Sequence, residues 1–381
     1  MFQAQSHSVS RLGSLSKLAA PSEVVRQFTP NWFAATMGTG ILALALAQIP
    51  VQLPGQKAIA RGLWMFDTGL FVLFASLYAA RWMFYFDGAR RIFRHGVMSM
   101  SLGCVPMGLA TIINGLLLFG APRWGHQAIV IAQALWGLDA LMALACGLAV
   151  PFLMFTRQDH SLEQMTATWL LPIVASEVAA VSGGLLAPHL TAAPALAVLI
   201  ASYGLWACSV PLALGVLVIL FLRLALHKLP PAHMAATSWL ALGPIGTGAL
   251  GLLVTGAAAP AILAANGLGA YGEAARGIGL IGGVLMWGYG LWWLAMATMI
   301  TLRHLRAGLP FNLGWWAYTF PLGVYAVATL RLSTLLPIPI LAVFAQGLVA
   351  ALAVLWLIVA ALTARGVWRG ELFVSPCLAQ D

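Results

Sequence analysis

A stretch that recurs four times along the chain decides the fold: CVPMGLAT (Cys104–Thr111), LLPIVASEVAA (Leu170–Ala180), LGPIGTGALG (Leu242–Gly251) and TFPLGVYAVA (Thr319–Ala328). In each copy an apolar or aromatic approach leads to a proline, and small residues follow it. By subtraction, successive prolines are separated by 66, 72 and 77 residues, which fits one repeated hairpin of two helices. The four prolines are Pro106, Pro172, Pro244 and Pro321.

Composition places these hairpins in a lipid bilayer. The 381-residue chain is 61% hydrophobic and 8% charged, whereas soluble domains carry about 25% charged residues. A spanning helix needs about 20 mostly apolar residues, and such stretches recur along the chain. We predict an all-α integral membrane protein with ten transmembrane helices, at Asn31–Ile49, Ile59–Tyr85, Val97–Phe119, His126–Phe155, Met165–Ala187, Pro194–Leu226, Met234–Ala257, Glu273–His304, Leu313–Leu330 and Ile340–Ala364.

The proline repeat falls on the odd-numbered helices. A proline inside a helix removes one hydrogen bond and kinks the helix, which a membrane tolerates where neighbours or a cavity satisfy the freed carbonyl. A single such helix is more simply explained by close packing, since Gly and Pro are common in membrane helices. A kink repeated in four alternate helices favours a pore lined by the odd helices. The first helix lacks a central proline but carries MGTG at Met37–Gly40.

The even-numbered helices are broad and aromatic, and we predict that they form the outer wall, facing lipid and neighbouring subunits. Their aromatic residues include Trp64, Phe66, Phe71, Phe74, Trp287, Trp292 and Trp293.

The distribution of basic residues predicts the topology. With both termini in the cytoplasm, fourteen Lys and Arg lie inside and five outside, as the positive-inside rule requires. The five on the outside are Lys57, Arg61, Arg123, Arg276 and Arg331. We therefore expect a multi-pass protein of the inner (plasma) membrane, with cytoplasmic tails at 1–27 and 368–381 and a transporter domain at 28–367. The polar N-terminal thirty residues contain no apolar core of a signal peptide.

Several functional classes are disfavoured. The net charge of +9 forms no basic stripe with interleaved aromatics, so nucleic acid is not an expected partner. No HExxH, GxSxG, Walker or dinucleotide motif occurs, and no CxxC pair indicates a metal. We expect no catalytic residues, metal or cofactor. A membrane-embedded enzyme or a receptor remains an alternative class, although the histidines lie near helix ends and no long soluble segment is present.

Three further stretches resemble a known family. FTPNWFAATMGTGI (Phe28–Ile41), SLGCVPMGLATIIN (Ser101–Asn114) and FNLGWWAYTFPLGVYA (Phe311–Ala326) are similar to the tellurite-resistance/dicarboxylate transporter family. That family includes plant slow anion channels, malate permeases and fungal sulfite efflux pumps. Loop segments within 155–175, 222–230 and 371–378 are most similar to the sulfite pumps.

The resemblance implies five helical hairpins around a central pore, usually in a homotrimer, and a phenylalanine gate that falls on Phe320. It implies a small inorganic or organic anion as the transported partner. Sulfite or bisulfite efflux is the leading hypothesis, and malate, nitrate, chloride or tellurite-linked transport are alternatives. Whether the protein is a channel or a proton-coupled carrier stays open.

The residues themselves supply candidates for anion contact. Little fixed positive charge lies at mid-membrane, so freed backbone N–H groups and hydroxyls are the expected donors. Arg331 lies 11 residues after Phe320, close to three helical turns, and so faces the same side of the ninth helix about 16 Å nearer the outside. A snorkelling arginine at a helix end is the alternative. The pore-lining candidates are Thr36, Thr39, Gly40, Ser101, Ser176, Thr247 and Arg331.

Three acidic residues lie inside predicted spans, where a carboxyl group is costly and suggests function. Asp67 and Asp139 are on even helices, where pairing with a neighbouring hydroxyl, amide or indole is the simpler interpretation. Glu177 follows the Pro172 kink on an odd helix, so it is either a proton-linked residue or a hydrogen-bond donor.

Overall fold

The computed structural model describes residues 15, 17–50 and 54–378, and all its regular elements in that range are helices. Within these residues, eight helices are long and apolar enough to cross a membrane. The helices in the first and ninth predicted spans are shorter, with 14 residues in α2 and 16 in α12. The all-α membrane class is therefore confirmed, whereas the count of ten spans stays a prediction.

Each odd-numbered span is a column in which a 3-10 helix leads into an α-helix. These inner columns are η1 (Pro30–Phe33) with α2 (Ala34–Ala47), η3 (Met98–Gly103) with α5 (Cys104–Gly115), η5 (Ala167–Leu170) with α8 (Leu171–Leu186), η7 (Ala232–Ala241) with α10 (Leu242–Ala265), and η9 (Leu313–Tyr318) with α12 (Phe320–Leu335). The outer helices are α3 (Gln56–Phe84), α7 (His126–Thr156), α9 (Ala192–His227), α11 (Gly272–Ala307) and α13 (Pro339–Arg369).

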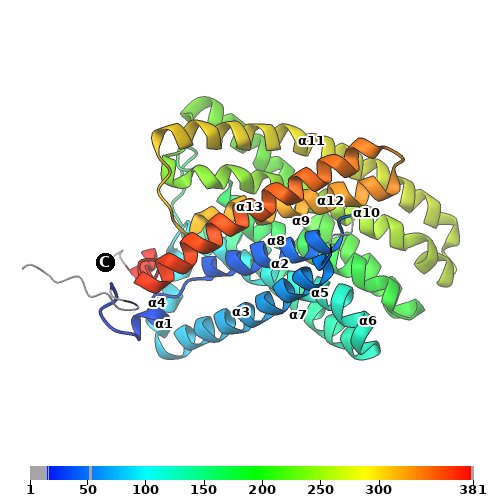
Figure 1. Ribbon diagram of the computed structural model, residues 1–381, viewed down its shortest axis with the longest axis horizontal. Coiled ribbons are helices and arrows are strands. Elements are labelled where there is room, and N and C mark those ends of the chain that lie inside the picture. The colour runs from blue at the N-terminus through cyan, green and yellow to red at the C-terminus, as the bar shows by residue number, and fades with distance from the viewer. Residues whose placement is uncertain (1–14, 16, 51–53, 379–381) are drawn as a thin grey trace, which may run out of the picture.

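Short elements connect the columns and the outer helices. They are α1 (Glu23–Arg26), α4 (Phe86–Arg90), η2 (Arg91–Arg94), the π-helical η4 (Leu116–Gly120), α6 (Ala121–Trp124), η6 (Ala187–His189), η8 (Gly269–Tyr271) and η10 (Pro376–Leu378). Figure 1 shows the long helices running along the molecule, with the C-terminal end of α13 at the same end as α1 and α4.

The inner columns form a closed ring. α2 packs on α5, α5 on α8, α8 on α10 and α10 on α12, and α12 packs back on α2. Each outer helix packs on the inner column that precedes it, which makes five hairpins. In the apolar stretches of α5, α8 and α10, 67 to 89% of residues are buried, against 17 to 39% in the outer helices. The predicted arrangement, with odd helices inside and even helices outside, is confirmed.

The repeated prolines stand where the 3-10 helix becomes an α-helix. Pro172 and Pro321 are the second residues of α8 and α12, while Pro106 and Pro244 are the third residues of α5 and α10. In the first turn of an α-helix the backbone N–H has no partner within the helix, so a proline there removes little. The four prolines therefore stand at these junctions and not in the middle of continuous α-helices, and the kinks themselves stay a prediction.

A tryptophan from each outer helix donates a hydrogen bond to the next inner column. The indole Nε1 atoms lie 2.9 to 3.3 Å from their acceptors. By subtraction the five tryptophans are 72, 70, 81 and 69 residues apart, which repeats the period of the hairpins. The pairs are Trp64 to Ile112 O, Trp136 to Ala179 O, Trp206 to Gly248 O, Trp287 to Thr329 Oγ1 and Trp356 to Thr39 Oγ1. We call these five contacts the indole clasps.

The clasps correct part of the prediction for the aromatic outer wall. Trp64, Phe74 and Trp293 are buried inside the protein, at 5, 7 and 2% exposure. Phe66 and Trp292 are exposed, as a lipid-facing wall requires. Sequence alone could not separate the two groups, because an outer helix has one face toward lipid and another toward the ring.

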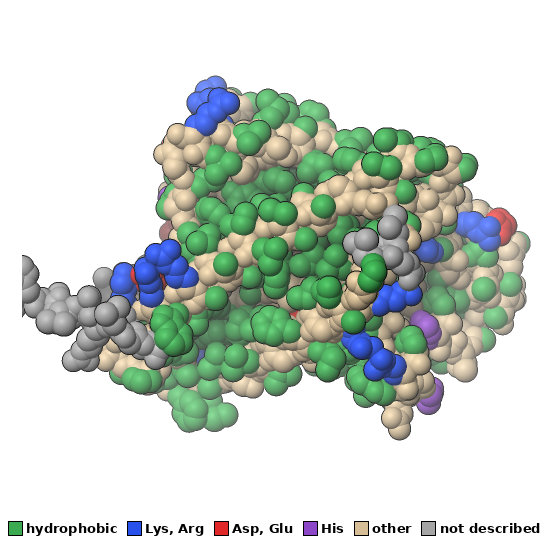
Figure 2. Space-filling model, in the orientation of Figure 1, with side chains coloured by type: hydrophobic (Ala, Val, Ile, Leu, Met, Phe, Trp, Pro, Cys, Tyr) green, Lys and Arg blue, Asp and Glu red, His purple; other side chains and the backbone are tan. Residues whose placement is uncertain are grey.

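The surface is apolar between two charged ends. Figure 2 shows Lys and Arg side chains gathered toward the ends of the molecule, with hydrophobic side chains along the helices between them. Exposed apolar residues on the outer helices include Phe155, Leu141 and Leu285. A band of this kind is what the hydrocarbon core of a bilayer solvates.

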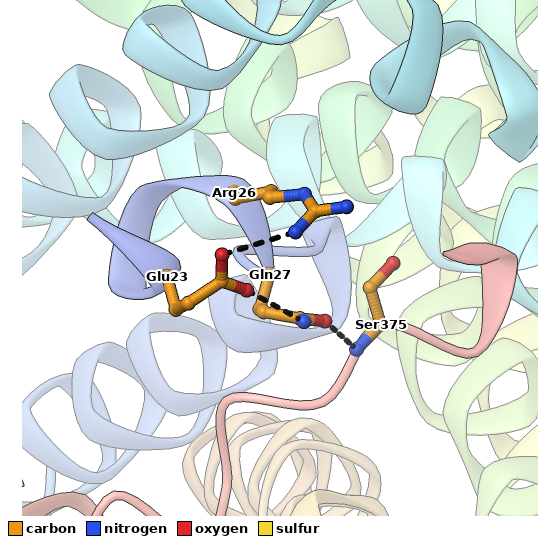
Figure 3. Close-up of polar contacts among 4 residues, drawn as sticks. All are labelled: Glu23, Arg26, Gln27 and Ser375. Carbon is orange, nitrogen blue, oxygen red and sulfur yellow. Dashed lines mark hydrogen bonds and ion pairs between the residues drawn. The ribbon is translucent and has the colours of Figure 1, made fainter. Parts of the chain in front are cut away.

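The C-terminal segment is tied to the N-terminal one at one end of the bundle. Ser375 N donates to Gln27 Oε1 at 2.8 Å, and Gln27 Nε2 donates to Glu23 Oε2 at 3.0 Å (Figure 3). The buried Arg81 guanidinium also donates to Ser375 Oγ at 3.1 Å. Hydrogen bonds from Gln27 and Arg26 lower the pKa of Glu23, so the stability it adds is present above the ordinary glutamate range and is lost as pH falls through the lowered value.

The indole clasps predict the effect of removing one N–H group. Trp206→Phe keeps most of the aromatic ring but removes the indole N–H that donates to Gly248 O, so we expect a loss of about 1 kcal/mol in stability. Thermal unfolding of the purified protein in detergent measures it. Trp292→Phe is the control, because Trp292 is 42% exposed and has no hydrogen bond among the described residues. Equal effects of the two substitutions would contradict a specific role for the clasp.

Candidate functional site

Two cavities lie inside the ring of inner columns. The larger has a volume of about 590 Å³ and the smaller about 170 Å³. The larger reaches Arg331 and His189, which lie on the predicted outside, and we call it the outer cavity. The smaller reaches Val97, His233 and Asn312 at the opposite end, and we call it the inner cavity. All five inner columns contribute to both linings.

Phe320 is part of the lining of both cavities. It is the first residue of α12, directly before Pro321, and its side chain is 4% exposed. Close contacts between α2 and its neighbours fix this position. A Cβ at Gly323 would lie 2.5 Å from Ile41, and one at Gly38 would lie 2.2 Å from Thr319. Because only glycine permits these approaches, α12 is held tightly against α2 and the Phe320 ring is set between the cavities.

The outer cavity combines apolar walls with a few polar groups and one unpaired cation. One stripe of α12 lines this cavity, from the phenyl ring of Phe320 through Val324 and Val327 to the guanidinium of Arg331. Arg331 Nε is buried and has no hydrogen-bond partner among the described residues, and the same is true of Asn114 Oδ1. The other polar lining residues are Gln48, Thr111, His189 and Thr247. Within the described residues no acidic side chain lines this cavity.

The inner cavity is also lined without acidic side chains among the described residues. Its hydroxyl groups come from Ser101, Thr168 and Thr237. Asn312 is held in place because its Nδ2 donates to His233 O at 2.9 Å and its Oδ1 accepts from Gly314 N at 2.8 Å. As far as the described residues show, both cavities lack the fixed negative charge that would repel an anion.

The three carboxyl groups inside the predicted spans line neither cavity, and none is exposed. Glu177 accepts hydrogen bonds from Ser209 Oγ at 3.2 Å and from Thr247 Oγ1. Asp67 Oδ2 accepts from Thr111 Oγ1 at 3.0 Å, while Asp67 Oδ1 has no partner in the described part of the chain. Neither oxygen of Asp139 has a partner there.

Comparison with known proteins agrees with this geometry. The family model described as voltage-dependent anion channel matches residues 27–364. The chain belongs to the voltage-dependent anion channel family. This membership confirms the family resemblance that the motifs indicated, and it makes the protein a transporter or channel for anions.

Individual relatives cover nearly the full chain. A sulfite efflux pump of Trichophyton rubrum is 37% identical over 370 residues, covering 96% of this chain and 98% of the pump. An uncharacterized transporter of Methanocaldococcus jannaschii is 32% identical over 92% of this chain and 96% of its own. The malic acid transport protein of Schizosaccharomyces pombe is 23% identical over 90% of this chain and 79% of its own.

The structure of this family member brings some of the predicted residues to the cavities and leaves others in the packing. Thr247 and Arg331 line the outer cavity, Ser101, Pro244 and Pro321 line the inner one, and Phe320 lines both. The remaining candidates are outside both linings: Thr36, Thr39, Gly40, Ser176, Pro106 and Pro172. Thr36 donates to Phe33 O and Thr39 to Ala35 O, so both hydroxyls bond to their own helix.

Sequence reasoning missed Thr111 and Asn114, which line the outer cavity. Both lie within the quoted third-helix motif, Ser101–Asn114, so the region was identified but not these residues. Which helix face each of them occupies, and so the pairing of Thr111 with Asp67 on α3, depends on rotation of each helix about its axis. The signal that could have identified them is a side chain able to form hydrogen bonds within a mostly apolar motif.

Proposed function

We propose that the protein conducts sulfite or bisulfite outward through the ring of inner columns, with Phe320 as the gate. The observation that carries this proposal is the unpaired guanidinium of Arg331 in a cavity that the described acidic residues do not line. A cation in such a position raises the local concentration of anions. The similarity to sulfite efflux pumps supports the choice of anion.

Malate is the second candidate, favoured by the similarity to a malic acid transport protein. Tight recognition of a dicarboxylate commonly uses one arginine fork for each carboxylate. The outer cavity offers one arginine, Arg331, in the described part of the chain. The hydroxyl and amide groups of the outer cavity suit a compact oxyanion. The geometry therefore supports sulfite over malate.

The proposal includes the assembly and its orientation. We place the protein in the plasma membrane with residues 28–367 as the transport domain and with the tails at 1–27 and 368–381 in the cytoplasm, because of the fourteen-to-five basic asymmetry. A homotrimer with one pore in each protomer fits the broad apolar faces of the outer helices. Lipid covers the rest of these faces.

The gate predicts that a smaller side chain at position 320 raises flux. A ring at a narrow point closes a pore by filling space and by excluding water, so Phe320→Ala should increase anion conductance. We expect about a tenfold rise, which corresponds to a barrier lower by about 1.4 kcal/mol. Conductance of purified protein in planar bilayers measures it.

Phe71→Ala is the matched control, because Phe71 lies on α3, packs on Phe33 and lines neither cavity. Its conductance should equal that of the parent. If Phe320→Ala is folded and conducts like the parent, Phe320 is not the gate.

The substrate assignment predicts sulfite flux well above malate flux. Proteoliposomes loaded with sulfite should release it at least about tenfold faster than proteoliposomes loaded with malate release malate. This ratio is expected if one carboxylate of malate lacks a charged contact of about 1.4 kcal/mol. Arg331→Gln should slow sulfite release, because the guanidinium that attracts the anion is removed. Malate flux equal to or above sulfite flux would assign the protein to malate transport and would leave the gate proposal intact.

The topology predicts accessibility from opposite sides. In a background without native cysteines, His189→Cys should react with an impermeant maleimide added to intact cells. Ser161→Cys, in the exposed loop between α7 and η5, should react only after permeabilisation. The reverse pattern would invert the proposed orientation.

A further inference from the structure

Two hydroxyl groups at the outer cavity each have a buried carboxyl group behind them. Thr111 on α5 contacts Asp67 of α3, and Thr247 on α10 contacts Glu177 of α8. Both threonines line the outer cavity, whereas neither carboxyl group does. We propose that Asp67 and Glu177, as protonated acids, turn Thr111 and Thr247 into hydrogen-bond donors for a compact oxyanion in the outer cavity. This inference rests on the proposed anion transport.

The hydrogen bonds around Glu177 show how such a relay works. Thr247 Oγ1 lies within hydrogen-bond distance of both Glu177 Oε1 and Gly243 O, but it has one proton to donate. An ionised carboxylate only accepts, so it would take that proton and leave the threonine with lone pairs, which repel an anion. A protonated acid donates to Thr247 Oγ1 instead, and the hydroxyl proton is released from the carboxyl group to Gly243 O. Because Gly243 O also lies in the helical hydrogen-bond pattern of α10, the hydroxyl proton can turn from this carbonyl to a ligand.

The second oxygen of Glu177 has a partner that fits the same state. Ser209 Oγ of α9 lies 3.2 Å from Glu177 Oε2 and 2.9 Å from Ile173 O. With the proton on Oε1, the oxygen Oε2 is a neutral carbonyl acceptor, and the single Ser209 hydroxyl proton is shared between it and Ile173 O. Hydrogen bonds in such a chain polarise one another, which strengthens the terminal donor.

Asp67 fits the protonated form for a different reason. Its Oδ1 atom is buried without a partner among the described residues, which is more costly for a carboxylate than for the carbonyl oxygen of a neutral acid. Gly40 leaves the room for this contact, since a Cβ there would lie 2.2 Å from Thr111 Oγ1 and 2.5 Å from Asp67 Oδ2. The predicted candidate Gly40 therefore serves the site through Thr111 and not by touching the pore.

No described charged side chain acts on either carboxyl group. Glu177 is hydrogen-bonded to hydroxyls of α9 and α10, and Asp67 to a hydroxyl of α5. Titratable groups on the neighbouring elements include Asp139 and Cys146 on α7, Cys104 on α5, and Tyr203, Cys208 and Arg223 on α9, and within the described residues none of them bonds to Glu177 or Asp67. Asp139 is equally buried but has no hydroxyl partner among the described residues, so it provides a natural control.

The test compares sulfite flux from proteoliposomes for four variants, normalised to folded protein. Glu177→Leu and Thr247→Val should each lower flux about tenfold, because each removes the donor. The double variant should be no slower than Thr247→Val alone, since groups that act through one another are not additive. Glu177→Gln should restore flux to within about twofold of the parent, because its amide N–H donates as the acid does. Its flux should also lose any dependence on pH that arises from Glu177.

Asp139→Leu is the control and should leave flux unchanged. Three outcomes would overturn the relay: Glu177→Gln as slow as Glu177→Leu, which would make Glu177 a proton carrier; additive losses in the double variant; or parental flux in Thr247→Val. Thermal stabilisation by sulfite is the second measurement, expected for the parent and Glu177→Gln and absent from Thr247→Val.

The two measurements separate this proposal from the proposed function. A parent that transports no anion but is stabilised by sulfite through Thr247 would keep the relay site and reject transport. If the parent transports sulfite and every variant has the full flux of the parent, the transport proposal is kept and the relay is rejected. A parent that shows neither effect would reject both.

Discussion

The indole clasps are the interaction on which the ring of inner columns depends. In a bilayer the hydrophobic effect does not hold helices together, because lipid tails are as apolar as leucine, so packing and hydrogen bonds must do so. Each outer helix supplies one indole N–H to the inner column after its own, which links every hairpin to the next. The last clasp, from Trp356 to Thr39, joins the end of the chain to its beginning and closes the ring.

Closure of the ring of inner columns explains why glycines stand where neighbouring columns meet. Gly246 approaches the backbone of Tyr325 so closely that a Cβ would lie 2.8 Å from its nitrogen, and Gly38 and Gly323 make similar contacts between α2 and α12. Columns that are this close leave a narrow lumen, in which a single ring such as Phe320 can separate two cavities. The clasps and the glycine contacts therefore fix the position of the Phe320 phenyl ring. The junction at Pro321 begins the helix that carries this side chain.

The hydrophobic pattern and the proline repeat were sufficient to predict the helices, their hairpins and which of them line the ring. They act through residue period and lipid exposure, both of which are local properties of the chain. The faces of individual helices could not be predicted, as Trp64 and Thr36 illustrate: both turn into the packing and not toward lipid or pore. Rotation about a helix axis is set by contacts between helices, so the partnership of Asp67 with Thr111 had no local signal. Phe320 was identified through family resemblance and Arg331 through helical spacing, and both lie on the same stripe of α12.

The placement of charge around this stripe matches the needs of conduction. Two unit charges 4 Å apart interact by about 4 kcal/mol where the effective dielectric constant is near 20, and that energy lengthens residence about a thousandfold. A guanidinium beside Phe320 would therefore hold an anion at the position where this side chain separates the two cavities. Arg331 is 11 residues further along α12, about 16 Å at 1.5 Å per residue, where it still lines the outer cavity. In the relay that we propose, neutral donors such as Thr111 and Thr247 contact the anion in the outer cavity, and each contributes about 1 kcal/mol. Contacts of this strength compensate in part for the hydration that the anion loses, and they are weak enough for the anion to dissociate quickly. The scarcity of charge at mid-membrane is therefore itself a requirement for passage.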